Sequence, residues 1–163
     1  RGWGAVVLGP AELCAKALPA AAPRVASGED PDEVVSDIAS TTRHQGGKMP
    51  GFGHPIHHPV DPRAERILAL AEERGVAGRH VDLLKRLRPA VATAWGKPLP
   101  LNVSGPIAAV LMDLDFPPTM IKAVPILART AGILGHLAEE QRRPLGFLLA
   151  HYAEEAIAYD PAG

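Results

Sequence analysis

Residues 50–63 read PGFGHPIHHPVDPR, a stretch too rich in glycine and proline to form a regular helix. Glycines, prolines and polar residues continue back to Thr41, so we expect one shaped loop over residues 41–62. Four of the seven histidines lie in it: His44, His54, His57 and His58. Because loops often present functional groups on a rigid scaffold, this loop is the first candidate for a functional site.

Helices are expected on both sides of this loop. Alanine and leucine dominate the remaining sequence and favour helices, while prolines and glycines mark the helix ends. No run of alternating β-branched residues indicates a strand. The sequence therefore predicts an all-α protein. The expected helices cover residues 10–18, a segment that starts at Asp30, 62–74, 81–95 with a bend or break at Pro89, 104–114, 118–142 with a kink at Pro125, and 145–159.

The composition excludes several classes of protein. With 47% hydrophobic and 21% charged residues, the 163-residue chain is of the globular type. A formal charge of −1 provides no field to gather nucleic acid. The most apolar tract, residues 123–135, carries Arg129, so no membrane partner is expected. The single cysteine, Cys14, permits no internal disulfide and favours the cytoplasm. The chain begins at Arg1 without a methionine, so we expect a missing N-terminal part.

Three basic residues are candidates for ligand binding. His54 is preceded by Gly51-Phe52-Gly53, which allows the backbone to approach a ligand closely. Arg63 lies in a first helical turn, where a cation is mildly unfavourable, and Arg129 lies in an apolar helix. One imidazole and two guanidiniums suit a small dicarboxylate, because arginine binds carboxylates in a bidentate manner. Structural arginine–acid pairs and capping histidines are common, so the residues alone leave that alternative open.

A metal site and a reactive cysteine are both disfavoured. His54, His57 and His58 are interrupted by Pro55 and Pro59, and the nearby Asp61 is better used as a helix cap. We therefore expect no metal. Cys14 lies in an alanine-rich helix without a basic neighbour, which is typical of a core residue.

The loop and several later segments resemble the signature of the citrate synthase superfamily, most closely its citryl-CoA lyase-type branch. The later segments follow in the order of the family and are LNVSG (101–105), LARTAG (127–132), GHLAEE (135–140) and RRP (142–144). The likeness covers nearly the whole chain. It implies an all-α, multi-helical fold in which the site lies in a cleft between a large and a small helical domain.

The resemblance also implies a domain organisation and a homodimer. Residues 1–45 would belong to the large domain, 46–105 to a small-domain segment with the GFGH loop, and 106–163 to C-terminal helices that return to the large domain and the dimer interface. The last two helices carry more apolar residues than one short chain can readily cover, which also favours a dimer. Examples are Leu127, Ile133, Leu134, Leu137, Leu148 and Leu149.

The activity implied by the resemblance is that of an enzyme that makes or breaks a C–C bond between a CoA thioester, such as acetyl-CoA, and a 2-oxo dicarboxylate, such as oxaloacetate. Coenzyme A enters as part of a substrate, and no permanently bound cofactor is implied. His54 would bind the keto or hydroxyl oxygen, and Arg63 and Arg129 would hold the carboxylates. The residues implied to lie near CoA are His57, His58, Lys97 and Asn102.

Two positions depart from the family pattern. The catalytic aspartate of the family falls on Ser104, whose hydroxyl has too high a pKa to act as a base at neutral pH. The second catalytic histidine of ordinary citrate synthases would fall near Leu8-Gly9, and lyase-type relatives also lack it. Two readings stay open: a citrate synthase or citryl-CoA lyase-like enzyme with altered activity, or a homologue that binds acyl-CoA with weakened catalysis.

Overall fold

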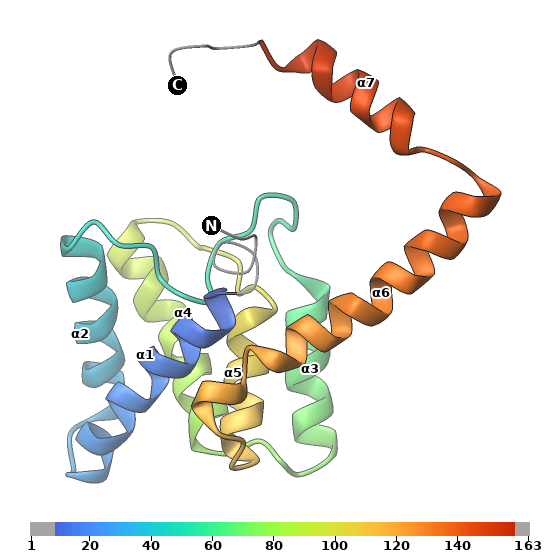
Figure 1. Ribbon diagram of the computed structural model, residues 1–163. Coiled ribbons are helices and arrows are strands. Elements are labelled where there is room, and N and C mark those ends of the chain that lie inside the picture. The colour runs from blue at the N-terminus through green and yellow to red at the C-terminus, as the bar shows by residue number, and fades with distance from the viewer. Residues whose placement is uncertain (1–8, 159–163) are drawn as a thin grey trace. The chain divides into compact units, whose positions relative to one another are not determined.

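Helices make up nearly all the regular structure of the computed structural model, which describes residues 9–158 (Figure 1). Within this range the one strand-like pairing is an isolated antiparallel bridge between Phe52 and Leu101. The predicted all-α class is thereby confirmed. The helices are α1 (Gly9–Ala26), α2 (Pro31–His44), α3 (Pro62–Glu73), α4 (Arg79–Trp95), α5 (Ser104–Asp113), the short 3₁₀ helix η2 (Pro118–Met120), α6 (Ala123–Arg142) and α7 (Gly146–Ala156).

The chain divides into two compact units, residues 1–125 and residues 126–163. The hydrophobic core belongs to unit 1, where α5 packs against α1, α3 and α4, and α2 packs against α4. Helix α5 is short and strongly apolar, which suits its place among three other helices. The largest fully buried apolar side chains of this core are Leu84, Leu101, Ile121, Val34, Val81 and Val91.

Three interior prolines do not break their helices, which corrects the expected end of α1 at Leu18 and excludes the break that was one of the two expectations at Pro89. Helix α1 was expected to end at Leu18 but continues through Pro19 and Pro23, and α4 continues through Pro89. An interior proline costs about 3 kcal/mol because it removes a backbone hydrogen bond. Tertiary packing outweighs this cost, since both helices bury an apolar face in the core on each side of the prolines.

The C-terminal helices also differ from expectation. The segment expected to be one helix from Pro118, kinked at Pro125, is the 3₁₀ turn η2 followed by α6, which begins at Ala123. Pro125 therefore lies in the first turn of α6, where its missing N–H has no helical partner to lose. The last helix ends at Ala156 instead of Tyr159, which lies outside the described residues.

The stretch Pro118–Arg142 is long and apolar enough to cross a membrane by length and composition alone.

The described part of unit 2 has no core of its own. The structure buries no residue of α6 or α7, although both helices carry large apolar side chains. Leu127 is 72% exposed, Leu134 67% and Phe147 96%. The apolar residues of the last two helices that the sequence analysis names as more than one chain can cover are all exposed.

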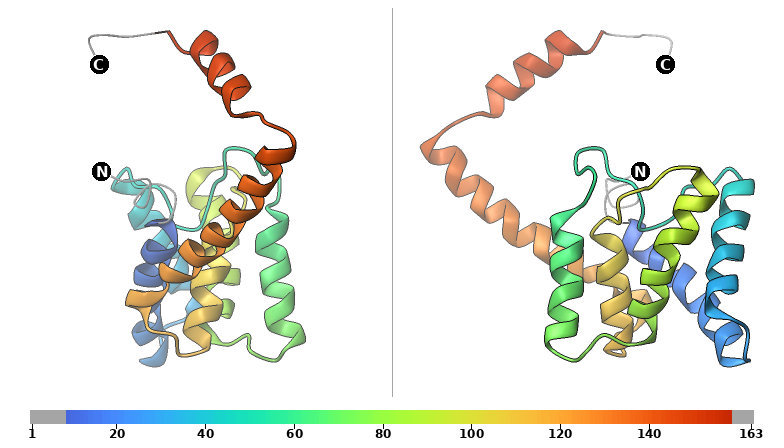
Figure 2. Two further views of the ribbon diagram at one scale, coloured as in Figure 1. Left: turned by 45° about the vertical axis from the view of Figure 1, so that its right-hand side comes forward. Right: turned by 180° about the vertical axis from the view of Figure 1, so that it is seen from behind.

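Different connections between helices lie at the two ends of unit 1. The loop between α2 and α3 and the connection between α4 and α5 lie together at one end, and the turn between α3 and α4 lies at the other (Figures 1 and 2). At that other end, the Asp113 carboxylate accepts hydrogen bonds from the backbone N–H groups of Gly78, His80 and Val81 and from His80 Nδ1, at 2.7–3.0 Å. One side chain therefore joins the end of α5 to the start of α4.

Candidate functional site

The glycine-rich loop is fixed to the α4–α5 connection by backbone hydrogen bonds. Gly53 N–H donates to Pro100 O and Asn102 N–H donates to Gly51 O, both at 2.8 Å. Gly51 has a φ of +84°, and a Cβ at this position would lie 3.1 Å from Cys14 Sγ and 3.2 Å from the Cα of Gly105. Glycine at position 51 therefore allows the loop to lie directly on the start of α5.

The side chain of Asn102 links the same two segments. Its Nδ2 donates to Gly53 O at 2.9 Å, and its Oδ1 accepts from Ser104 N–H at 3.0 Å. Gly53, which precedes His54, and Ser104, the first residue of α5, are therefore both hydrogen-bonded to the side-chain amide of Asn102. The structure uses both ends of the Asn102 amide within the protein, while its predicted place near CoA stays a prediction.

His54 is held in one tautomer by its own loop. Its Nδ1 accepts the backbone N–H groups of Ile56 and His57, at 3.1 and 3.0 Å. The proton of the neutral imidazole therefore lies on Nε2. Partial burial, together with His57 and Arg63, lowers the pKa of His54 below its usual value, which favours the neutral ring. The loop thus presents the Nε2–H of His54 as a hydrogen-bond donor.

Arg63 is paired with the aspartate that caps its helix. Asp61 is the N-cap of α3, as the sequence predicts, and is fully buried, whereas the Arg63 side chain is 46% exposed. Arg63 donates from Nε to Asp61 Oδ1 at 3.0 Å and from an Nη atom to Oδ2 at 2.8 Å. These hydrogen bonds hold the pKa of Asp61 at about 2, so the carboxylate is ionised at neutral pH. The other Nη of Arg63 makes no hydrogen bond among the described residues.

His54 and Arg63 meet at the surface of this loop. The same Nη atom of Arg63 that reaches Asp61 lies 3.2 Å from His54 Nε2. Arginine can only donate, so this contact is itself a hydrogen bond only in the tautomer with the proton on Nδ1. In the tautomer described above, with the proton on Nε2, two donors lie side by side, and an oxygen acceptor could accept from both. The pair therefore forms a site suited to an anion or a polarised carbonyl oxygen.

A cation fits the same residues poorly. His54, His57 and Asp61 place one ligand atom each within 4.8 Å of one another, which is close enough for a metal site by distance alone. However, His54 Nδ1 already accepts two N–H groups, and both Asp61 oxygens accept from Arg63. The guanidinium also places a positive charge where the metal would lie. The donor set favours an anion on chemical grounds.

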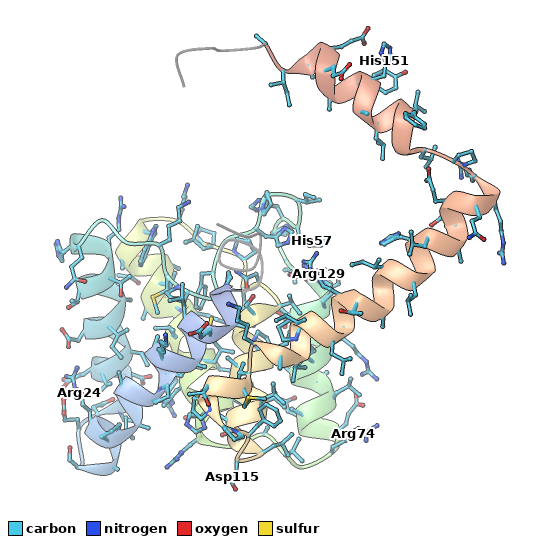
Figure 3. The ribbon with its side chains drawn as sticks, viewed as in Figure 1. Arg24, His57, Arg74, Asp115, Arg129 and His151 are labelled. Carbon is cyan, nitrogen blue, oxygen red and sulfur yellow. The ribbon has the colours of Figure 1, made fainter. Side chains whose placement is uncertain are left out.

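The other predicted site residues lie around this pair to different degrees. His57 is half-buried, and its ring centroid lies 4.4 Å from that of His54. His58 and Lys97 are exposed, and Ser104 is the first residue of α5. Figure 3 shows His57 at this end of unit 1, with Arg74 and Asp115 at the opposite end. Arg129 is exposed on α6 in unit 2, so its predicted convergence with Arg63 stays a prediction.

Sequence reasoning missed the second role of Asp61. It predicts the helix cap, but the carboxylate also binds the guanidinium of Arg63 and, at 3.2 Å, the backbone N–H of Val103. The Asp-Pro-Arg order contains a signal for the first contact, because an N-cap aspartate lies close to the side chain two residues later. The contact with Val103 joins residues 42 apart in sequence, and no local pattern indicates it.

Comparison with known proteins gives one consistent result. The family model for the C-terminal domain of citrate synthase matches residues 15–146. A citrate synthase from Saccharolobus solfataricus is 30% identical over 122 residues, which are 70% of this chain and 32% of the relative. A putative citrate synthase 2 from Mycobacterium tuberculosis is 32% identical over 107 residues, 60% of this chain and 27% of the relative.

A solved structure supports the same relationship. The citryl-CoA lyase from Hydrogenobacter thermophilus superposes with a TM-score of 0.72 and 27% sequence identity, over 85% of this chain and 52% of that protein. The chain thus spans about a third of the length of the curated relatives and about half of that lyase.

Proposed function

Because this chain belongs to the citrate synthase superfamily and resembles its citryl-CoA lyase branch, we propose that it works in C–C bond cleavage or formation between an acyl-CoA and oxaloacetate. The observation that carries the proposal is the pair of donors on the loop, His54 Nε2–H and the Arg63 guanidinium. Two adjacent donors suit the oxygens of a 2-oxo dicarboxylate. Coenzyme A would be part of a substrate, and no permanently bound cofactor is required.

The pair has a direct use in this chemistry. In condensation, the carbon nucleophile derived from the acyl-CoA attacks the keto carbon, and the C=O electron pair moves onto its oxygen. In cleavage, the same oxygen carries negative charge as the C–C bond breaks. A hydrogen bond from His54 Nε2–H would stabilise that charge in both directions, and Arg63 would hold an adjacent carboxylate. His57, His58, Lys97 and Asn102 are proposed to lie near the CoA portion.

The direct test is the reaction itself, made with the native protein that contains this chain. Citryl-CoA should be cleaved to acetyl-CoA and oxaloacetate, or the reverse condensation should form citryl-CoA, from which hydrolysis of the thioester by water would release citrate and free CoA. Binding is measured separately, through the rise in unfolding midpoint that a ligand specific for the folded state produces. If neither oxaloacetate nor a CoA thioester raises the midpoint and no turnover occurs, the proposal is rejected.

Arg129 is proposed as the second carboxylate ligand. A charge-assisted hydrogen bond contributes roughly 1.5–3 kcal/mol, so Arg129→Leu should weaken oxaloacetate binding by about tenfold or more. Titration calorimetry measures the affinity, and circular dichroism checks that the helix is retained. The control is Arg74→Leu, an exposed arginine at the opposite end of unit 1 (Figure 3). An affinity unchanged by Arg129→Leu but lowered by Arg63→Leu would remove Arg129 from the site.

The apolar surface of α6 and α7 supports a homodimer. Leu127, Leu134 and Leu149 are each more than 60% exposed, and exposed apolar surface of this extent marks protein interfaces. We propose that a second copy of the chain covers these helices, with roughly 2,000 Å² or more buried in total. A dimer interface would account for the apolar residues of α6 without a membrane span. We propose that the protein is located in the cytoplasm.

Sedimentation tests the assembly. The native protein should sediment as a dimer at micromolar concentration, and Leu134→Asp should shift it toward the monomer because a buried unpaired charge is costly. Leu114→Asp, which changes an exposed leucine just after α5, serves as the control and should leave the dimer intact. A native protein that is monomeric under these conditions would refute the dimer.

A further inference from the structure

Asp61 makes more contacts than a helix cap requires. Its side chain has no exposed surface, and each carboxylate oxygen accepts two hydrogen bonds. Oδ1 accepts from the backbone N–H and the Nε of Arg63, at 3.1 and 3.0 Å. Oδ2 accepts from an Nη of Arg63 at 2.8 Å and from Val103 N–H at 3.2 Å. The carboxylate therefore joins α3, the exposed guanidinium and the residue just before α5.

A second cap in the same chain shows what capping alone needs. Helix α2 begins with the same Asp-Pro pair, Asp30-Pro31, and Asp30 is also the N-cap. The Asp30 side chain is exposed and accepts from Asp32 N–H at 2.8 Å, and no guanidinium of residues 9–158 is paired with it. The burial and the Arg63 contacts of Asp61 are therefore not consequences of the cap.

We propose that Asp61 is a positioning residue, which fixes the direction of the Arg63 guanidinium toward the oxygen site beside His54. The inference rests on the proposed function for its substrate, a dicarboxylate. Asp61 binds the Nε side of the guanidinium. The shared Nη therefore lies 3.2 Å from His54 Nε2, and the other Nη makes no hydrogen bond with any residue that the structure describes. Because the arginine is already ordered, less side-chain freedom is lost when an anion binds.

A positioning role and a purely electrostatic role of Asp61 predict opposite changes in the affinity for an anion when Asp61→Asn removes the negative charge. Asp61 partly cancels the positive charge of Arg63, so a purely electrostatic role would make anion binding tighter in Asp61→Asn. If Asp61 instead holds the fork in place, the freed arginine must be ordered again by each ligand, and binding becomes weaker. Asparagine is an N-cap as good as aspartate, so the substitution keeps the start of α3.

The experiment compares Asp61→Asn with the matched control Asp30→Asn. Titration calorimetry with oxaloacetate should show an affinity about tenfold lower in Asp61→Asn, unchanged in Asp30→Asn, and unchanged for the CoA thioester in both. The ¹⁵N relaxation of the Arg63 Nε–H group, measured without ligand, should show a rigid side chain in the wild type and a mobile one in Asp61→Asn. A merely structural role would lower folding stability without this selective loss.

Each outcome decides a separate question. Oxaloacetate binding that is unchanged or tighter in Asp61→Asn overturns the inference, as does a wild-type Arg63 Nε–H as mobile as that of the exposed Arg74. A rigid Arg63 in a wild-type protein that binds no dicarboxylate rejects the proposed function and retains the positioning. Should Asp61→Asn not fold, Asp61→Ser keeps a capping side chain and takes its place in both measurements.

Discussion

A carboxylate introduced by Ser104→Asp should raise the rate of condensation, and of solvent exchange of the acyl-CoA methyl protons, by roughly 10²–10⁴-fold, the usual contribution of a general base. Ser104 begins α5, and its N–H is already held by Asn102 Oδ1. An aspartate is favourable at a helix start, so the change should not unfold the protein. The affinity for oxaloacetate should change little, since the oxygen site uses His54 and Arg63.

The control for this prediction is Ser104→Asn, which has the size of aspartate but no basic carboxylate. Deuterium incorporation into acetyl-CoA, followed by mass spectrometry, separates proton removal from the later C–C step. An equal rise in both variants would show that shape, not basicity, is responsible. A wild-type protein whose exchange already matches that of ordinary citrate synthases would show that another residue is the base.

The largest loss of stability is expected from Asp113→Ala. The side chain of Asp113 is buried, and its carboxylate accepts hydrogen bonds from three backbone N–H groups and the ring of His80. Burial opposes ionisation, but these donors outweigh it and keep the pKa of Asp113 below its usual value. Removing one partner of such a buried pair costs about 3–5 kcal/mol. That is a large part of the 5–15 kcal/mol or so by which a typical domain is stable.

Denaturant unfolding measures this loss, with Asp82→Ala as the control. Asp82 lies in the first turn of α4, the helix whose start Asp113 binds, and forms an exposed ion pair with Arg86, so its removal should cost about 1 kcal/mol or less. A loss no greater for Asp113→Ala than for Asp82→Ala would contradict the role assigned to the carboxylate.

The helical class and several helix boundaries follow from local sequence. Asp30-Pro31 and Asp61-Pro62 each begin a helix as predicted, because an aspartate cap and a proline in the first turn satisfy or remove the orphan N–H groups. The interior prolines of α1 and α4 were misjudged for a physical reason. The cost of a proline is local, whereas the burial that outweighs it includes the packing of α1 on α5 and of α4 on α2, two pairs of helices that are distant in sequence.

The candidate site also has features that depend on local sequence and features that depend on tertiary packing. Sequence by itself determined that His54 follows a glycine-rich turn, that Arg63 follows a capping aspartate and that Ser104 begins a helix, since each depends on neighbours within a few residues. Only the tertiary structure decided that Asn102 binds the carbonyl of Gly53 and that Asp61 binds the N–H of Val103. These contacts join segments more than 40 residues apart. They form only when the packing of α5 brings the α4–α5 connection against the loop. There a side chain can satisfy a buried polar group that local sequence does not identify.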